Sequence, residues 1–149
     1  MAELAVMNCL FCRLIHEDTA RWVAQEAEAC AFLPPDQLAP GHTLVVPARH
    51  HPDVFDIPPG ALAATVALAQ RVAAAMRTAL GATGVNILSA SGPGSEQSVP
   101  HLHFHVVPRW TGDGISTWPA GTSRHRLTGD PGVLLADALG RDREPRHGS

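Results

Sequence analysis

The chain contains no lysine and no tyrosine, and only three of its 149 residues are cysteines. All 11 basic residues are therefore arginine, a bias typical of GC-rich coding that says little about chemistry. The first residues lack the basic start and apolar core of a signal peptide, so we expect a cytoplasmic protein. A small, odd number of cysteines in such a chain argues against a disulfide framework. The close pair Cys9 and Cys12 is better explained by a metal.

Excess positive charge and long apolar runs are also missing. The formal net charge is -3, whereas proteins that bind the nucleic acid backbone usually carry the opposite sign, so no nucleic acid partner is expected. The chain has no run of about 18 consecutive apolar residues, which predicts no membrane span. Hydrophobic residues make up 45% of the chain, enough for one packed core. We therefore expect a single domain over residues 1–149.

Short apolar runs between turn residues predict five strands, over residues 21–26, 29–33, 41–47, 84–89 and 100–108. One clear helix is predicted from Pro58 to Leu80, with Asp56 as its cap and Gly81 as its stop. Its apolar stripe comprises Leu62, Val66, Ala69, Val72, Met76 and Leu80. A short helix is predicted over 133–139, and residues 141–149 are expected to fray.

The segment richest in histidine is His101-Leu102-His103-Phe104-His105. Successive side chains of a strand point to opposite faces, so the three histidines are predicted to share one face at spacings of roughly 7 Å. Such a row could bind one catalytic zinc, or a neutral imidazole could act as a nucleophile while its neighbour binds phosphate. A polar sheet face that carries histidines by accident is the remaining alternative. The loop over 91–98, rich in glycine and serine, favours phosphoryl chemistry because its N–H and hydroxyl groups suit phosphate oxygens.

The segment His101–Val107 matches the His-φ-His-φ-His-φ-φ signature of the histidine triad (HIT) superfamily, in which φ is an apolar residue. Three more segments resemble landmarks of its zinc-bearing bacterial members, in the same order and spacing. They are Gln97-Ser98-Val99, the run Gly41–Pro47 followed by His50, and Cys9-Leu10-Phe11-Cys12. The resemblance covers roughly residues 8–110 and leaves 111–149 as a C-terminal extension.

The resemblance implies an α+β fold, with an antiparallel sheet of about five strands and the main helix packed across it. It also implies a homodimer and an enzyme that needs no organic cofactor. Such an enzyme is a hydrolase or transferase of nucleotides or related phosphorylated small molecules. It cleaves a phosphoanhydride, a phosphoramidate or a related bond at the α-phosphate.

By position, the resemblance makes His103 the nucleophile that forms a transient nucleotidyl-histidine. His105 would bind phosphate oxygens and assist the leaving group. Ser98 would donate a hydrogen bond to phosphate, with Gln97 beside it as part of the substrate site. His42 would lie behind the row and set the tautomers of its imidazoles. A plain core histidine is the alternative for His42.

The zinc-bearing members hold their metal with a set that corresponds here to Cys9, Cys12, His50 and His101. These four residues would form a closed, structural Cys2His2 zinc site that fastens the N-terminal segment to the domain. Two buried thiols without metal are the alternative for the cysteine pair. Cys30 lies in an apolar run and is predicted to be ordinary core.

Two departures from the family pattern concern the sugar. Pro34 stands where nucleotide-binding members usually have the Asp that holds the ribose hydroxyls, and Asp36 lies two residues on. Ala90 stands where they often have Asn, and Glu96 adds charge near the phosphate site. The substrate is therefore expected to be an unusual nucleotide or another phosphorylated metabolite. The alternative is a zinc-stabilised binding or dimerisation module with a residual active site.

Overall fold

The computed structural model describes residues 8–142. The chain forms two compact units, Met1–Ile115 and Ser116–Ser149, which are described separately. The boundary lies five residues beyond the segment covered by the family resemblance. The expected single domain over 1–149 stays a prediction. Most of the segment expected to fray, residues 143–149, lies outside the described residues.

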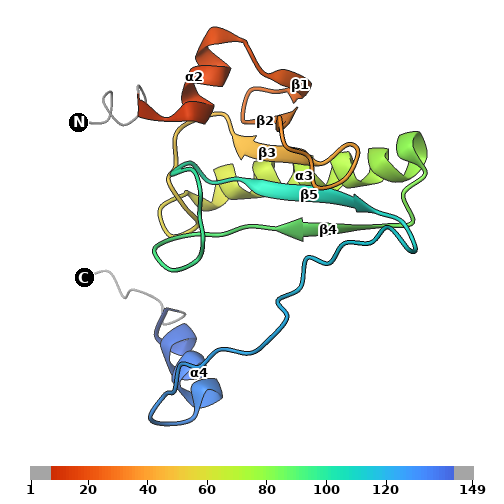
Figure 1. Ribbon diagram of the computed structural model, residues 1–149. Coiled ribbons are helices and arrows are strands. Elements are labelled where there is room, and N and C mark those ends of the chain that lie inside the picture. Colours follow the sequence, from red (N-terminus) through yellow and green to blue (C-terminus); the bar gives the residue numbers. More distant parts are fainter. Residues whose placement is uncertain (1–7, 143–149) are drawn as a thin grey trace, which may run out of the picture. The chain divides into compact units, whose positions relative to one another are not determined.

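The first unit is built on an antiparallel sheet of five strands in the order β1-β2-β3-β5-β4 (Figure 1). The strands are β1 (Arg21–Gln25), β2 (Ala29–Leu33), β3 (Thr43–Pro47), β4 (Gly84–Leu88) and β5 (Phe104–Arg109). The predicted α+β fold with a five-stranded antiparallel sheet is confirmed. The last strand is shorter than predicted, because residues 100–103 bend and β5 begins only at Phe104.

Helix α3 (Pro59–Leu80) packs across one face of the sheet, as predicted. Its N-cap is Pro58, which makes no side-chain capping bond, so the predicted cap Asp56 is wrong. The predicted stripe is also partly wrong, because Val66 and Leu80 are nearly half exposed. The helix buries Thr65, Leu68, Ala69, Val72 and Met76. Leu68, Ala69, Val72 and Met76 pack on Ala31, Val45 and Val106 of the sheet.

By length and composition alone α3 is apolar enough to cross a membrane, contrary to the expectation from uninterrupted apolar runs. Its alanine-rich sequence produces this result. In the fold, its Leu68, Val72 and Met76 belong to the core between helix and sheet. That is the position of a core helix in a globular unit.

Helix α2 (Leu10–Glu17) was not predicted, and it covers part of the opposite sheet face. Cys9 is its extended N-cap, and the helix ends at Asp18, whose φ of 55° is left-handed. Phe11, Leu14 and Ile15 share one side at helical spacing and pack into a second core with Phe32 of β2. Docking of this side holds the short helix on the sheet.

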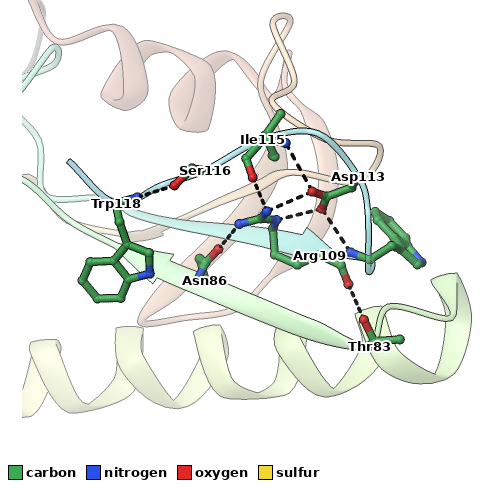
Figure 2. A network of polar contacts seen from close by, with 8 residues as sticks. Thr83, Asn86, Arg109, Asp113, Ile115, Ser116 and Trp118 are labelled. Carbon is green, nitrogen blue, oxygen red and sulfur yellow. Dashed lines mark hydrogen bonds and ion pairs between the residues drawn. The ribbon is translucent and has the colours of Figure 1, made fainter. Parts of the chain in front are cut away.

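Arg109 holds residues 110–115, the segment after β5, against the sheet (Figure 2). Its guanidinium donates from Nε and Nη2 to the two carboxylate oxygens of Asp113, at 2.8 and 2.9 Å. Nη1 donates to the side-chain oxygen of Asn86 on β4 at 2.7 Å, and Nη2 also donates to the carbonyl of Ile115. Residues 110–115 therefore belong to the first unit.

The second unit contains helix α4 (Pro131–Asp142), which is longer than the predicted 133–139. Asp130 caps it, because its carboxylate accepts from the backbone N–H of Val133 at 3.0 Å. Pro131 suits the first helical position, where no N–H is needed.

Candidate functional site

The three histidines of the predicted row separate into two groups. Only His105 lies in β5, while His101 and His103 precede the strand in a bent segment. The N–H of His101 donates to the carbonyl of Val99, two residues back, and this tight turn directs His101 toward the cysteines. The ring centroids of His103 and His105 are 5.0 Å apart, so these two side chains lie next to each other.

Backbone contact sets the tautomer of His103. This imidazole is 3% exposed, and its Nδ1 lies 2.8 Å from the carbonyl oxygen of His101. Since a carbonyl only accepts, Nδ1 carries the hydrogen and Nε2 keeps the lone pair. Burial lowers the pKa of His103, opposed by this backbone hydrogen bond. His103 thus presents a neutral nitrogen with an unshared electron pair.

His105 has the opposite tautomer, set through His42. The backbone N–H of Leu38 donates to Nδ1 of His42 at 3.1 Å, so the hydrogen of His42 is on Nε2. That Nε2 lies 2.9 Å from Nδ1 of His105, which must then accept, leaving the hydrogen of His105 on its own Nε2. His103 offers an electron pair and His105 offers a hydrogen, from adjacent rings.

Both His105 and His42 are kept neutral by their surroundings. Burial, and then His103 and His42 nearby, lower the pKa of His105 to about 4. Burial also lowers the pKa of His42, which is 3% exposed. His42 lies against His105, and the part that it plays in the reaction stays a prediction.

The four residues predicted to hold zinc come together. Their ligand atoms all lie within 4.8 Å of one another. Nδ1 of His101 is 3.5 Å from Sγ of Cys9 and 3.4 Å from Sγ of Cys12, and Nδ1 of His50 is 3.3 Å from Sγ of Cys12. Among residues 8–142, these four form the group of His, Cys, Asp or Glu side chains whose ligand atoms lie close enough together to hold one metal ion.

The donor set fits a zinc ion. Bond lengths of about 2.0–2.3 Å in a tetrahedron place neighbouring ligand atoms about 3.3–3.8 Å apart, which brackets these contacts. Nε2 of His101 lies 2.9 Å from the carbonyl of Pro47, so Nε2 carries the hydrogen and Nδ1 is left to bind metal. Burial, followed by hydrogen bonding and Coulombic interaction with Cys9, raises the pKa of Cys12 to about 12, so metal binding displaces protons there.

The two cysteines of the cluster come from one short segment of the chain. They stand at the start of α2, one as its N-cap and one in its first turn. Cys30 lies buried in β2, in the second core, as predicted.

The predicted phosphate loop runs beside the site. Ser98 is exposed at its end, and Glu96 is exposed with a left-handed φ of 68°. The side-chain amide of Gln97 donates to the carbonyls of Pro52 and Val99 at 2.6 and 3.0 Å, and its oxygen accepts from the N–H of Gly92 at 3.0 Å. The phosphate contacts predicted for Ser98 and Gln97 stay predictions.

A cavity of about 350 Å³ lies beside Phe32. It is lined by Leu10, Leu14, Thr19, Ala20, Arg21, Phe32, Leu33, Pro34, Pro35 and Gln37. Phe32 pairs across the strands with Leu44, which pairs with His105, so the cavity and His105 share one row of the sheet. None of these lining residues, all within the described range 8–142, carries a carboxylate, because Pro34 stands in the wall and Asp36 does not contribute.

Two contributors were missed at the sequence level. Phe11 meets the rings of His103 and Phe32 edge-on, with centroids 5.2 and 5.3 Å apart. The hydroxyl of Ser89 donates to the carbonyl of His103 at 2.8 Å. The helical spacing of Phe11, Leu14 and Ile15 was the available signal for the first, while nothing in the sequence pointed to Ser89.

The chain is similar to known proteins in sequence. A family model described as HIT domain matches residues 16–112. An uncharacterized HIT-like protein of Mycobacterium tuberculosis is 40% identical over 111 residues, covering 74% of this chain and 77% of that protein. Adenylylsulfatase HINT3 of Arabidopsis thaliana is 29% identical over 103 residues, covering 68% of this chain and 52% of that protein.

Among solved structures, a zinc-bound histidine triad family protein from Mycobacterium smegmatis is similar, with a TM-score of 0.71 and 35% identity. The match covers 91% of this chain and 96% of that chain. A HIT family protein from Bacillus anthracis has a TM-score of 0.77 and 27% identity, over 91% of this chain and 96% of that chain.

Proposed function

The chain belongs to the HIT domain family, and from that premise we propose that it is a hydrolase or transferase acting on a nucleotide-like phosphate compound. The bond it breaks is a phosphoanhydride, a phosphoramidate or a phosphate ester, and the intermediate is a phospho-histidine at His103. The single observation that carries this proposal is the pair of opposite tautomers, an unshared electron pair on His103 beside an N–H on His105.

In the first step, Nε2 of His103 attacks the α-phosphorus, and the bond from phosphorus to the leaving group breaks. The positive charge that develops on the His103 ring is stabilised by the His101 carbonyl, which accepts from Nδ1 at 2.8 Å. The N–H on Nε2 of His105 donates a hydrogen bond to a phosphate oxygen, while the departing atom takes the electron pair of the broken bond and a proton from solvent.

In the second step, a water oxygen attacks phosphorus and the bond to Nε2 of His103 breaks. The electron pair of that bond returns to Nε2 of His103, and the proton that the water loses passes to solvent, so both rings return to their starting state. A second hydroxyl compound in place of water makes the same step a transfer. The supporting groups His42 and Leu38 hold His105 in the required tautomer throughout.

Zinc would be held by Cys9, Cys12, His50 and His101, and it would supply a structural cross-link between α2 and the sheet. Neither step passes through it. The ring of His101 contributes to the metal cluster, whereas its carbonyl serves His103. A homodimer is part of the proposal through the family resemblance.

The mostly apolar cavity beside Phe32 suits a flat organic group on the α-phosphate. The side chain of Pro34 in its wall offers no acceptor to a ribose diol, and an unmatched buried hydroxyl costs about 1–3 kcal/mol. The substrate is accordingly a nucleotide with an altered sugar, or a phosphorylated metabolite with an apolar group. The name of the Arabidopsis relative makes adenylyl sulfate a compound to include in any test.

The test is intact-protein mass spectrometry after rapid, acid-free quenching with a panel of compounds. The panel holds adenosine 5′-phosphoramidate, adenylyl sulfate, a dinucleoside polyphosphate and their 2′-deoxy forms. We expect a covalent adduct in the wild type and in His16→Ala, an exposed-histidine control, and none in His103→Ala. Turnover of a compound without any adduct, or an adduct that persists in His103→Ala, would contradict the mechanism. No reaction across the panel would favour the binding-module alternative.

A further inference from the structure

Gln97 joins two segments that are far apart in the sequence. Its amide nitrogen donates one hydrogen to the carbonyl of Pro52 at 2.6 Å and the other to the carbonyl of Val99 at 3.0 Å. Its amide oxygen accepts from the N–H of Gly92 at 3.0 Å. Since an amide nitrogen has only two hydrogens, none remains for a phosphate oxygen unless one of these bonds breaks.

Two further hydrogen bonds connect the same two segments. The N–H of Val54 donates to the hydroxyl of Ser91 at 3.0 Å, and the N–H of Leu102 donates to the carbonyl of His51 at 2.7 Å. The loop over residues 91–102 is therefore held to residues 51–54 at both of its ends and, through Gln97, along its length.

The backbone between the ties is tightly curled. Gly92 and Gly94 have φ values of 86° and 82°, and Glu96 has a φ of 68°, which is unfavourable for a residue with a Cβ atom. A residue with a Cβ atom keeps such an angle only when surrounding contacts hold it. The bonds of Gln97, the residue directly after Glu96, act at that place.

The loop is connected to the His103 ring through the backbone of His101. Val99, which accepts from Gln97, also accepts from the N–H of His101, and the His101 carbonyl accepts from Nδ1 of His103. At the other end, the Ser89 hydroxyl donates to the His103 carbonyl. A displacement of the loop therefore moves both Ser98 and the backbone that sets the His103 tautomer.

We propose that Gln97 is a positioning residue that ties the glycine-rich loop to residues 51–54 and fixes Ser98 and His103 relative to each other, without binding phosphate itself. The claim that the loop serves phosphate rests on the proposed function. The claim that Gln97 holds the loop concerns the protein without substrate and is tested separately.

The experiment compares the wild type with Gln97→Met, which keeps the length of the side chain and removes all three hydrogen bonds. Gln70→Met is the matched control, because Gln70 is exposed on α3. Hydrogen exchange of the zinc-loaded protein without substrate is measured first. We expect Gly92, Val54 and Leu102 to exchange about five- to tenfold faster in Gln97→Met, with the β3 amides and Gln70→Met unchanged.

Ser91→Ala is a second variant that removes the neighbouring side-chain tie without touching Gln97. Single-turnover rates at saturating substrate should fall about tenfold in both Gln97→Met and Ser91→Ala, with zinc content unchanged. Orthophosphate binding, followed by calorimetry, provides a probe that does not depend on turnover.

Unchanged exchange in Gln97→Met together with weaker orthophosphate binding would make Gln97 a phosphate ligand and overturn the proposal. Faster exchange with wild-type single-turnover rates would overturn it too, because the loop position would then not matter. If no substrate is found, the exchange result still decides whether Gln97 holds the loop, so failure of the proposed function is recognised separately.

Discussion

Nε2 of His42 lies 2.9 Å from Nδ1 of His105, and this contact between two neutral rings determines which nitrogen of His105 can meet a substrate. We predict that ¹⁵N spectra show His105 protonated on Nε2 and His103 protonated on Nδ1. In His42→Ala, His105 should populate both tautomers, and the single-turnover rate should fall about tenfold, because part of the population no longer offers a hydrogen from Nε2 and the ring loses its fixed orientation. An unchanged His105 tautomer in this variant would contradict the role given to His42.

We predict that the nucleophile is separable from the fold. Within the described part of the chain, the ring of His103 makes one hydrogen bond, to a backbone carbonyl, and is not part of the metal cluster. His103→Ala should therefore keep its zinc and nearly its melting temperature, while turnover falls by several powers of ten. His101→Ala should lose zinc and stability first. Loss of zinc from His103→Ala would instead support a metal bound by the histidine row.

One zinc per chain is the prediction for the cluster of Cys9, Cys12, His50 and His101. Cys12→Ser should lower metal content and melting temperature together, because metal binding is coupled to folding. Cys30→Ser is the matched control, since Cys30 is a buried thiol outside the cluster, and it should keep the full zinc content. Elemental analysis of freshly purified protein is the measurement, and a metal-free wild type would refute this prediction.

The fold should lose stability as the pH falls from about 6.5 to about 4. Burial, together with His103 and His42, lowers the pKa of His105 to about 4, whereas an unfolded histidine titrates near its ordinary value of about 6.5. Between these values the unfolded chain binds more protons than the folded chain, so acid favours unfolding. Urea unfolding at several pH values should show a flatter profile in His105→Gln than in the wild type.

Restoring acceptors for a ribose should shift the substrate preference. Pro34 lies in the wall of the apolar cavity, and Ala90 precedes the glycine-rich loop. We predict kcat/KM values for ordinary ribonucleoside phosphoramidates well below about 10⁵ M⁻¹s⁻¹, and a rise in Pro34→Asp with Ala90→Asn. A wild type that already reaches this value on such a compound would show that Pro34 does not limit sugar recognition.

The sheet was predictable because residues that end strands or form turns mark the boundaries of its strands. β2 has the predicted bounds, and β3 ends at Pro47 as predicted, since proline removes a ladder donor. The position of α3 followed from its apolar residues and Gly81. The prediction of its buried face was only partly right. Thr65 is buried and its hydroxyl donates a hydrogen bond to the carbonyl of Ala61, and a hydrophobic pattern does not indicate that a threonine is buried.

The site was less predictable than the fold. A strict alternation over residues 101–105 suggested a strand with three equivalent histidines. The turn at Val99 and the bond from Leu102 to His51 bend this segment, and the second of these joins backbone atoms that are distant in sequence. The role of Gln97 was hidden for a related reason, because all three of its partners are backbone groups that only the fold brings together.

Helix α2 carries consecutive residues with different tasks. Cys9 and Cys12 face the metal cluster, Leu10 and Leu14 line the cavity, and Phe11 lies against His103. Each residue added to a helix rotates the later residues by about 100° around its axis. Inserting one residue between the two cysteines would therefore displace one metal ligand relative to the other, and it would also change the cavity wall and the contact between Phe11 and His103. Redesign of substrate choice can replace Leu10 or Leu14 singly, but the helix can be transplanted between relatives only as a whole, in its original register.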